Sequence, residues 1–425
     1  MATPKRSPMS PISGPSRAMF PRGIRTGAWW RPNRRKVAAL AGLGLLAMNG
    51  VAPADPSRAL PPLGQEADFS PLAFSALPGW RQDDALAAFR AFLETCRPLA
   101  EGAPAQRLGV KPPAALVAVC RKALAAPPAD NAAARAFFEA HFQPFEVRPR
   151  SGSGFLTAYF EPEIMASHAR TAEFPVPVLA RPTDLVTFQP DEPRPPGIDA
   201  RYAAARLSEG VHSIFPDRAA IWAGALAGQG LEIAWLRDEA ELFITQVQGS
   251  ARLTLTDGTR ARLTYAGRNG HPYTSIGRIL VEQGEISLPE MSLERLMGWL
   301  RADPARGRAL MERNQSYIFF ALEPMLDPAR GPIGGAGVPL TTGRSLAVDR
   351  TLWPYGLPVW IEASPLTPEG PRASLDRLMI AQDTGTAIVG PARGDFFMGP
   401  GAEAGQRAGL VRDAMRFVVL WPRGA

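Results

Sequence analysis

The sequence predicts an α+β protein that is mainly β, with barrel-like parts. Apolar residues recur at helical spacing in a block that ends near residue 142, and short β runs dominate from Gly152 onward. The 40 glycines and 44 prolines indicate many turns between short strands. A chain of 425 residues, 46% of them hydrophobic, is large enough for one big domain or two of ordinary size.

Apolar residues three and four positions apart predict three helices near the N-terminus, over Asp83–Arg97, Pro112–Ala125 and Asn131–Phe142. The same spacing predicts two helices in the middle of the chain, over Tyr273–Glu285 and Leu288–Ala302. A helical segment is therefore expected before the first β region.

A hairpin is predicted where Arg252–Thr256 and Thr259–Thr264 flank Asp257-Gly258, a dipeptide that favours a tight turn. Gly331–Gly337 is predicted to be a turn at which two backbones approach closely. Short apolar runs between Gly and Pro loops predict strands over Ser316–Leu322, Pro358–Ala363, Arg377–Gln382 and Arg416–Trp421.

The net charge of +7 comes from the N-terminal segment. Residues 1–54 hold nine basic side chains and no Asp or Glu, which leaves 38 basic and 40 acidic side chains in residues 55–425. A basic nucleic-acid-binding body is therefore excluded, and no nucleic-acid partner is expected.

Residues 1–54 have the features of a secretory signal peptide. A basic cluster at residues 31–36 precedes the apolar run Val37–Met48, which is shorter than the roughly 20 residues of a membrane-spanning helix. We predict cleavage after Ala54, followed by a Pro-rich lead-in at 55–81. An uncleaved N-terminal anchor, a true start at Met19, and the choice between Sec and twin-arginine export all remain open.

Cys96 and Cys120 are the only cysteines. In an exported protein an even number of cysteines predicts a disulfide, and two buried free thiols on neighbouring helices are the alternative.

The motifs give little support to a metal site, a nucleotide-binding site or the catalytic triad of a hydrolase. His141, His168, His212 and His271 are scattered, without an HExxH motif or a CxxC pair. The sequence also lacks a GxSxG elbow, a Walker loop and a GxGxxG after a strand. No metal or organic cofactor is therefore expected.

Three carboxylates lie in a Gly-rich β context near the C-terminus: Asp349, Asp383 and Asp395. Aspartates in such loops commonly cap a turn. Asp383 and Asp395 each lie at the edge of an apolar strand, and Gly385 and Gly390 between them allow the chain to bend both into one cleft. A buried carboxylate beside another holds its proton more tightly, as a general acid for glycosidic-bond cleavage requires.

Six segments, in the same order along the chain, resemble the family of membrane-bound lytic murein transglycosylase A, which has a C-terminal three-aspartate (3D) domain. They are Gly154–Pro162, Phe243–Arg252, Tyr265–Arg278, Asn314–Phe320, Val338–Pro358 and Ala381–Gly399. The three carboxylates that match the family are Asp349, Asp383 and Asp395.

The resemblance implies a double-psi β-barrel domain formed by residues 82–160, which include the helical segment, and 314–425. Residues 161–313 would form a second, smaller β-rich domain inserted between these two parts. A groove between the domains would hold the expected partner, a glycan strand of peptidoglycan. Partners among proteins of cell-wall synthesis or division remain open.

The resemblance also implies a peptidoglycan lytic exotransglycosylase. Such an enzyme cleaves the β-1,4 bond between N-acetylmuramic acid and N-acetylglucosamine without water and leaves a 1,6-anhydromuramic acid end. Asp395 matches the catalytic position, first as general acid and then as base, and Asp383 is the supporting carboxylate. For Asp349 a supporting role and a turn-fixing role both remain open, as do exo or endo cleavage, stem-peptide preference and oligomeric state.

Five residues in the matching segments are candidates for substrate binding: Tyr159, Gln248, Asn269, His271 and Tyr273. Their amide, imidazole and aromatic groups suit sugar hydroxyl and acetamido groups, with a packing or loop-fixing role as the alternative for each.

Two other functions stay open, a hydrolytic muramidase in which Asp383 activates water and a non-catalytic peptidoglycan-binding module. Well-known members of the family carry a lipobox cysteine for outer-membrane anchoring, and no cysteine precedes Cys96. We therefore expect a periplasmic protein that is soluble or held by an uncleaved N-terminal segment.

Overall fold

The described part of the protein combines helices with a larger number of strands, as the predicted α+β, mainly β class requires. The computed structural model describes residues 66–190 and 192–424, all of which belong to one compact unit. The predicted signal peptide, 1–54, and the first part of the 55–81 lead-in lie outside the described residues.

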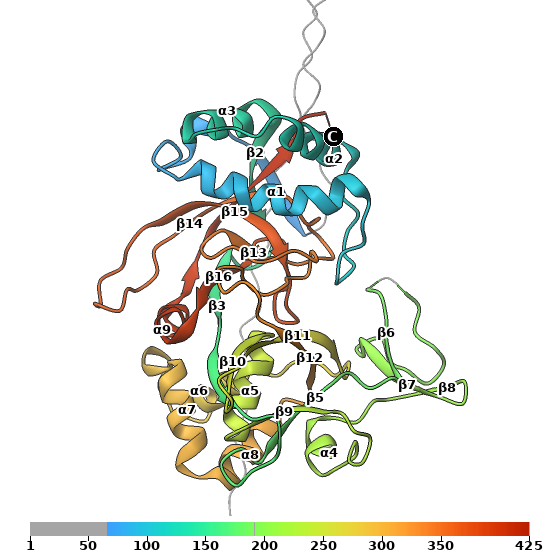
Figure 1. Ribbon diagram of the computed structural model, residues 1–425. Helices are drawn as coiled ribbons and strands as arrows, with labels where there is room; N and C mark the ends of the chain where they lie inside the picture. Colours follow the sequence, from blue (N-terminus) through green and yellow to red (C-terminus); the bar gives the residue numbers. More distant parts are fainter. Residues whose placement is uncertain (1–65, 191, 425) are drawn as a thin grey trace, which may run out of the picture. The chain divides into compact units, whose positions relative to one another are not determined.

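The largest sheet has nine strands that come from both ends of the described chain (Figure 1). Their order across the sheet is β1-β2-β18-β14-β15-β13-β16-β3-β17. The strands are β1 (Ala67–Pro71), β2 (Phe142–Pro149), β3 (Phe155–Glu161), β13 (Ser345–Ala347), β14 (Pro358–Ala363), β15 (Leu375–Asp383), β16 (Arg393–Pro400), β17 (Arg412–Ala414) and β18 (Arg416–Pro422). Part of the Pro-rich lead-in thus forms the edge strand β1, which pairs with β2.

Three helices cover one face of this sheet, close to the ranges predicted for them: α1 (Ala85–Glu101), α2 (Ala114–Ala125) and α3 (Asn131–His141) (Figure 1). Asp84 caps α1 by accepting a hydrogen bond from the Ala87 N–H, and Asp130 caps α3 in the same way.

The central strands of the sheet are buried on both faces, which explains their continuous apolar sequences. Along β14, Val359 and Ile361 belong to the core that the strands of this sheet form with one another. Trp360 belongs to the core between the sheet and the helices. In β15, Met379 belongs to the inner core and Leu378 to the helix-facing core. Alternate side chains of one strand therefore stabilise two separate cores.

A second group of sheets follows β3. The four-stranded sheet has the order β12-β11-β10-β4, and two smaller sheets have the orders β5-β9 and β6-β7-β8. The strands are β4 (Glu163–Ala166), β5 (Val176–Leu179), β6 (Leu185–Thr187), β7 (Ala204–Ser208), β8 (Val211–Ser213), β9 (Glu232–Leu236), β10 (Ala251–Leu255), β11 (Arg260–Arg268) and β12 (Ile318–Pro324). The predicted hairpin is present as β10 and β11, with Gly258 at a φ of 84° in its turn.

The helices of the middle and C-terminal regions differ from the predicted ones. They are α4 (Arg218–Trp222), α5 (Glu239–Gln248), α6 (Ile276–Glu282), α7 (Leu293–Ala302), α8 (Pro304–Glu312) and α9 (Gly401–Leu410), besides 3-10 turns at Phe74–Ala76 and Leu288–Glu290. The predicted helix Tyr273–Glu285 is shorter because Ser275 caps it, which leaves Tyr273 in an extended segment. The predicted helix Leu288–Ala302 is interrupted because Ser292 caps α7.

Glu161 joins the two groups of sheets at the end of β3. Its carboxylate is fully buried and accepts hydrogen bonds from Arg252 Nε at 2.7 Å and Arg262 Nε at 2.6 Å. Arg252 lies in β10 and Arg262 in β11, so this buried ion-pair triad fixes the four-stranded sheet to the C-terminal end of β3.

No helix in the part of the chain that the structure describes is long and apolar enough to cross a lipid bilayer.

Candidate active site

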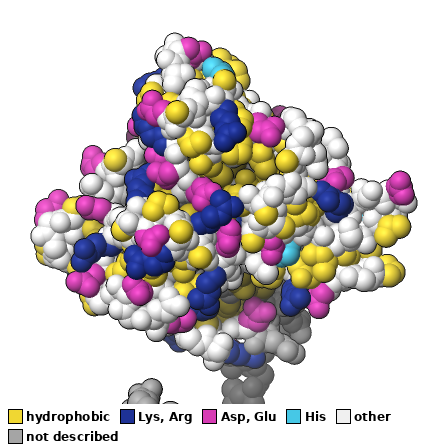
Figure 2. Space-filling model, turned by 90° about the horizontal axis from the view of Figure 1, so that it is seen from below, with side chains coloured by type: hydrophobic (Ala, Val, Ile, Leu, Met, Phe, Trp, Pro, Cys, Tyr) yellow, Lys and Arg dark blue, Asp and Glu magenta, His cyan; other side chains and the backbone are white. Residues whose placement is uncertain are grey.

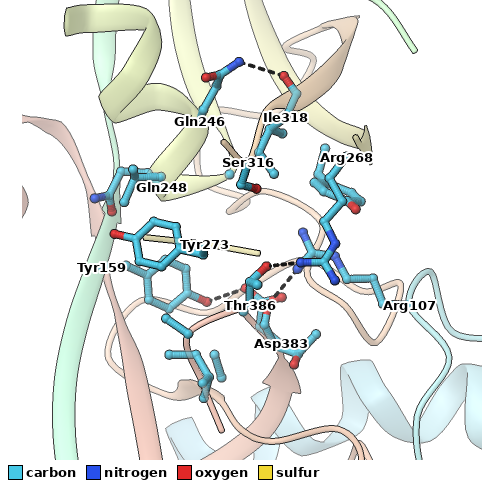
Figure 3. A pocket seen from close by; sticks show the side chains of 18 of the residues that line it. Arg107, Tyr159, Gln246, Gln248, Arg268, Tyr273, Ser316, Ile318, Asp383 and Thr386 are labelled. Atoms are coloured by element: carbon cyan, nitrogen blue, oxygen red, sulfur yellow. Dashed lines mark hydrogen bonds between the residues drawn. The ribbon is translucent and has the colours of Figure 1, made fainter. Parts of the chain in front are cut away.

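A cleft of about 620 Å³ lies between the nine-stranded sheet and the second group of sheets. Its walls come from β3 and β16 on one side, from the end of α5 and from β11 on the other, and from the loop that follows β15. In Figure 3, Tyr159 and Gln248 lie on one side of the cleft, Arg107 and Arg268 lie on the opposite side, and Asp383 lies between them.

The sheet register brings Asp383 and Asp395 together. Ala347 in β13 is the partner of Asp383 in β15 on one side and of Asp395 in β16 on the other. Side chains at one register level of neighbouring strands point to the same face of a sheet. Both carboxylates accordingly line the cleft.

Asp395 is held by the strand beside it. Thr157 in β3 is its register partner and donates its hydroxyl to Asp395 Oδ1 at 2.5 Å, while accepting a hydrogen bond from Arg393 Nη2 at 2.7 Å. Burial raises the pKa of Asp395 above its ordinary value, against the lowering effects of the Arg393 charge and the Thr157 hydrogen bond, and the charge of Asp383 raises it further. Asp395 is therefore suited to hold a proton until it is needed.

Asp383 has partners that suit an ionised carboxylate. Tyr159 donates its hydroxyl to Asp383 Oδ2 at 2.7 Å, and the Gly335 N–H donates to Oδ1 at 2.8 Å. The predicted close approach of two backbones in Gly331–Gly337 is present here, because a Cβ on Gly334 would lie 2.7 Å from the Gln382 carbonyl oxygen. The two donors fix the carboxylate and stabilise its negative charge.

Asp349 lies outside the cleft lining and is buried in a turn. Its Oδ1 accepts hydrogen bonds from the backbone and hydroxyl of Thr351, and its Oδ2 accepts one from the Gly390 N–H at 2.8 Å. Gly390 belongs to the loop between Asp383 and Asp395, so Asp349 holds that loop in place.

Three of the five predicted binding residues line the cleft, namely Tyr159, Gln248 and Tyr273. Gln248 Oε1 accepts a hydrogen bond from the Phe160 N–H at 3.1 Å. The Tyr159 ring contacts Phe397, with the ring centroids 5.4 Å apart. These contacts hold the two side chains in the wall of the cleft.

Asn269 and His271 occupy other positions. Asn269 is fully buried, donates its amide to the carbonyls of Pro216 and Gln315, and accepts from the Tyr317 N–H. His271 is 5% exposed, and its Nε2 lies 2.7 Å from the Phe215 carbonyl oxygen. It lines a smaller hollow that shares Tyr273 with the cleft. Both side chains fix the loop that carries Tyr273.

Sequence reasoning missed several residues of the cleft. Thr157 lies within a matching segment, and its position two residues before Tyr159 on a strand places both side chains on one face. Arg393 follows the same pattern two residues before Asp395. Arg107 carries no comparable signal, because it lies in a loop far from the other cleft residues in sequence.

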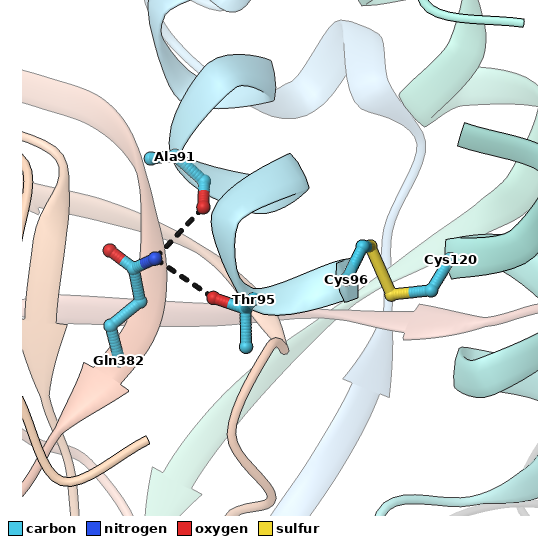
Figure 4. The surroundings of a disulfide bond; sticks show 5 residues. All are labelled: Ala91, Thr95, Cys96, Cys120 and Gln382. Carbon is cyan, nitrogen blue, oxygen red and sulfur yellow. Dashed lines mark hydrogen bonds between the residues drawn. A yellow bond between two sulfur atoms is a disulfide. The ribbon is translucent and has the colours of Figure 1, made fainter. Parts of the chain in front are cut away.

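That loop, residues 102–113, joins α1 to α2 and enters the cleft. The Arg107 N–H donates to the Gly335 carbonyl at 2.9 Å, and the Arg107 guanidinium lies 3.8 Å from the centroid of the Tyr265 ring. A disulfide between Cys96 in α1 and Cys120 in α2 closes the base of the loop, as Figure 4 shows. The cysteines therefore bracket the segment that brings Arg107 to Asp383.

Among the described residues, no group of three or more His, Cys, Asp or Glu side chains is arranged to hold a metal ion.

Comparison with known proteins matches two parts of the chain to two sequence families. Residues 155–321 match the MltA specific insert domain, and residues 344–421 match the 3D domain. Membrane-bound lytic murein transglycosylase A of Vibrio cholerae is 33% identical over 280 residues, which are 65% of this chain and 66% of that protein.

Two solved structures extend this similarity to the fold. The membrane-bound lytic murein transglycosylase of Agrobacterium tumefaciens is 41% identical with a TM-score of 0.76, and the match covers 84% of this chain and 98% of that one. E. coli MltA with bound chitohexaose is 29% identical with a TM-score of 0.54, and the match covers 72% of this chain and 81% of that one.

The fold and the paired carboxylates place the chain in the class of lytic murein transglycosylases. The chain belongs to the MltA family, as the resemblance in its sequence predicts.

Proposed function

We propose that this protein is a peptidoglycan lytic exotransglycosylase. It cleaves the β-1,4 bond between N-acetylmuramic acid and N-acetylglucosamine and leaves a 1,6-anhydromuramic acid end. The observation that carries the proposal is the half-buried Asp395 in the cleft, whose pKa is raised by its partial burial and whose neighbours in the cleft include a second carboxylate. The membership of the chain in the MltA family supports the same reaction.

Asp395 begins the reaction as the acid. It gives its proton to the glycosidic oxygen, and the bond between that oxygen and C1 of the muramic acid breaks. The C6 hydroxyl of the same sugar then attacks C1, and its proton passes to the Asp395 carboxylate. Asp395 is thereby protonated again, and no water is consumed. Attack within one sugar has the advantage of a tethered nucleophile.

Asp383 supports this step as a fixed negative charge. Its two hydrogen-bond donors, Tyr159 and Gly335, hold it in the cleft without a mobile counter-ion. A carboxylate placed in this way stabilises the positive charge that develops on the sugar ring, and it also raises the pKa of Asp395.

Tyr159, Gln248 and Tyr273 contact the glycan in this proposal, because they line the cleft with aromatic and amide groups. Asn269 and His271 act indirectly by fixing the loop that carries Tyr273, and Asp349 acts by fixing the loop between the two carboxylates.

The proposed architecture is a double-psi β-barrel domain, residues 82–160 and 314–425, with residues 161–313 inserted. The nine-stranded sheet with strands from both ends of the described chain supports this division. The proposed location is the periplasm, where peptidoglycan lies, and the disulfide between Cys96 and Cys120 is consistent with that oxidising compartment.

Mass spectrometry of the muropeptides released from isolated peptidoglycan tests the proposal. The chain should release products one water lighter than reducing-end muropeptides. Asp395→Asn should bind peptidoglycan and release no more than about a hundredth of the wild-type amount. Asp257→Asn is the matched control, because Asn-Gly preserves the exposed hairpin turn, and it should release products at the wild-type rate.

Each rival function has its own outcome in this experiment. Products with ordinary reducing ends would identify a hydrolytic muramidase with Asp383 as the base for water. Binding without any released product would identify a peptidoglycan-binding module.

A further inference from the structure

Three arginines, Arg107, Arg268 and Arg350, line the cleft, and Arg107 and Arg268 lie opposite Tyr159 and Gln248 (Figure 3). We call them the arginine cluster. Burial lowers the pKa of Arg268 against the raising effect of Tyr265, and the positive charges of Arg107 and Arg350 lower it further, so the Arg268 guanidinium is repelled by the other two. A repulsive arrangement of this kind destabilises the protein unless a negative charge offsets it.

The hydrogen bonds that hold the arginine cluster go to neutral acceptors. Arg107 Nη1 donates to the Thr384 carbonyl at 2.7 Å, and Arg268 Nη1 donates to the Thr386 hydroxyl at 2.6 Å. Arg350 Nη1 donates to the Leu108 carbonyl at 2.9 Å. A guanidinium has five N–H donors, and Arg107 Nε is buried without a partner.

No carboxylate of residues 66–190 and 192–424 forms an ion pair with the arginine cluster. The negative charge of Asp383 raises the pKa of Arg107, but the carboxylate oxygens of Asp383 accept hydrogen bonds from Tyr159 and Gly335.

Three other poorly exposed arginines have acidic partners, whereas the buried Arg218, which also lines the cleft, is held by the neutral acceptors Asn314, Gln246 and Ser316. Arg252 and Arg262 share Glu161, and Arg344 pairs with Asp83 at 2.8 Å. On the outer face that Figure 2 shows, basic and acidic side chains are interspersed. The arginine cluster therefore concentrates positive charge in the cleft without an ion pair among the described residues, and the charge of Asp383 offsets only part of it, at Arg107.

We propose that the arginine cluster binds the free carboxylates of the peptides attached to the glycan strand, and that the enzyme prefers peptide-bearing strands to peptide-free ones. The inference rests on the proposed function, because it takes peptidoglycan as the substrate. In a peptide-bearing strand the lactyl carboxyl group of each muramic acid is tied up in the amide bond to its peptide, so the sugar backbone is neutral there, whereas the attached peptides end in carboxylates. Arginine binds carboxylates with two parallel hydrogen bonds, which a neutral sugar cannot replace.

The smaller hollow beside the cleft provides room for such a peptide. It shares Arg268, Tyr273 and Thr386 with the cleft, Arg201 adds further positive charge to its lining, and Arg278, which pairs with Glu282 at 3.3 Å, lines it as well. A peptide that leaves the glycan near Asp383 would thus pass along arginine side chains.

Binding to soluble glycan strands tests the proposal without requiring turnover. The Asp395→Asn chain is titrated with peptide-bearing strands and with the same strands after an amidase has removed their peptides, which leaves one lactyl carboxylate next to the ring of each muramic acid but none of the more distant peptide carboxylates. We expect the peptide-bearing strands to bind about tenfold more tightly, and this preference to shrink at high salt. Adding Arg268→Gln should abolish most of the preference, whereas Arg268→Lys, which keeps the charge, should retain part of it.

Arg295→Gln is the control, because Arg295 is an exposed arginine outside both hollows, and it should leave the preference unchanged. Equal binding of the two strands, or a preference that Arg268→Gln does not alter, would overturn the inference. Failure of the proposed function has a different signature, since it appears as missing anhydro products in the unsubstituted chain. If Arg268→Gln fails to fold, the comparison is repeated with Arg350→Gln.

Discussion

The side-chain amide of Gln382 donates a hydrogen bond to the Thr95 hydroxyl at 2.8 Å (Figure 4). The same amide donates to the Ala91 carbonyl at 2.8 Å. Thr95 is the neighbour of the disulfide cysteine Cys96, and Gln382 is the neighbour of Asp383. One buried side chain therefore connects the disulfide-bonded helix α1 to the strand that positions a carboxylate of the cleft.

Replacing Gln382 by leucine should destabilise the protein and slow the reaction. The change leaves the Thr95 hydroxyl and the Ala91 carbonyl without their buried partner, at a cost of about 2–4 kcal/mol in the free energy of unfolding. Urea denaturation measures this loss. Gln283→Leu, at an exposed position after α6, is the control and should change the free energy by less than about 0.5 kcal/mol. Equal effects of the two variants would contradict a connecting role for Gln382.

Removing the disulfide with Cys96→Ala and Cys120→Ala together should lower the free energy of unfolding by about 3 kcal/mol, because the unfolded chain loses a cross-link between residues 24 apart. The loop with Arg107 should also become less ordered, so binding to peptide-bearing strands should weaken. Denaturation and strand titration measure the two effects. Intact mass after alkylation checks the bond itself, since two thiols that alkylate without reductant would refute it.

The pH dependence of the reaction should reflect Asp395. Burial raises its pKa above the ordinary value of 3.8, and an acid catalyst must carry its proton, so the rate should fall as the pH rises through the raised pKa. The Thr157 hydroxyl lowers that pKa. Thr157→Val should therefore move the alkaline limb of the pH–rate profile to higher pH, and Thr157→Ser should leave it near its original position. A limb that moves to lower pH would contradict this assignment.

The same carboxylate should make stability depend on pH. Because the folded state holds the Asp395 proton more tightly than the unfolded state does, its contribution is fully present below the unfolded pKa. It is lost as the pH rises through the folded pKa. Asp395→Asn should thus become more stable relative to the wild type as the pH rises from 3.8, the ordinary pKa, through the raised pKa of the folded state. Urea denaturation across this range gives the difference, and a constant difference would count against a raised pKa.

Tyr159→Phe should lower kcat about tenfold with little change in KM. The substitution removes the hydroxyl that donates to Asp383 and keeps the ring that contacts Phe397. Steady-state kinetics on soluble strands separates the two constants. Tyr202→Phe, at a tyrosine outside both hollows, is the control. An increase in KM alone would indicate that Tyr159 binds the sugar. It would also mean that the contribution of Asp383 to catalysis does not depend on the Tyr159 hydroxyl.

The N-terminal helices and the C-terminal strands were predictable because their patterns are local. The caps Asp84 and Asp130 and the apolar period of three and four mark α1 and α3, and the strand predicted over Pro358–Ala363 has the same bounds as β14. Helix α9 was not predicted, because three of its ten residues are glycines, which disfavour a helix, and its packing against β3 stabilises it.

The carboxylates of the cleft were predictable from their strand edges and from the family resemblance, but their surroundings were not. Thr157 lies 238 residues before Asp395 in sequence, and Arg107 lies 277 residues before Thr384. Contacts at such separations depend on sheet order and loop entry, which no local pattern encodes. Asn269 has the amide expected of a sugar ligand, yet four backbone groups already bond its side chain.

The nine-stranded sheet has a consequence for how this protein can be divided. Residues 344–421, taken alone, would contain both carboxylates but would leave β16 without β3 and β18 without β2. They would also expose Trp360 and Leu378, which α1–α3 cover. Such a fragment would carry the acids of the enzyme while lacking Thr157 and Tyr159, which hold them. Any genetic exchange that moved only this segment would transfer the reactive groups without the scaffold that makes them an enzyme.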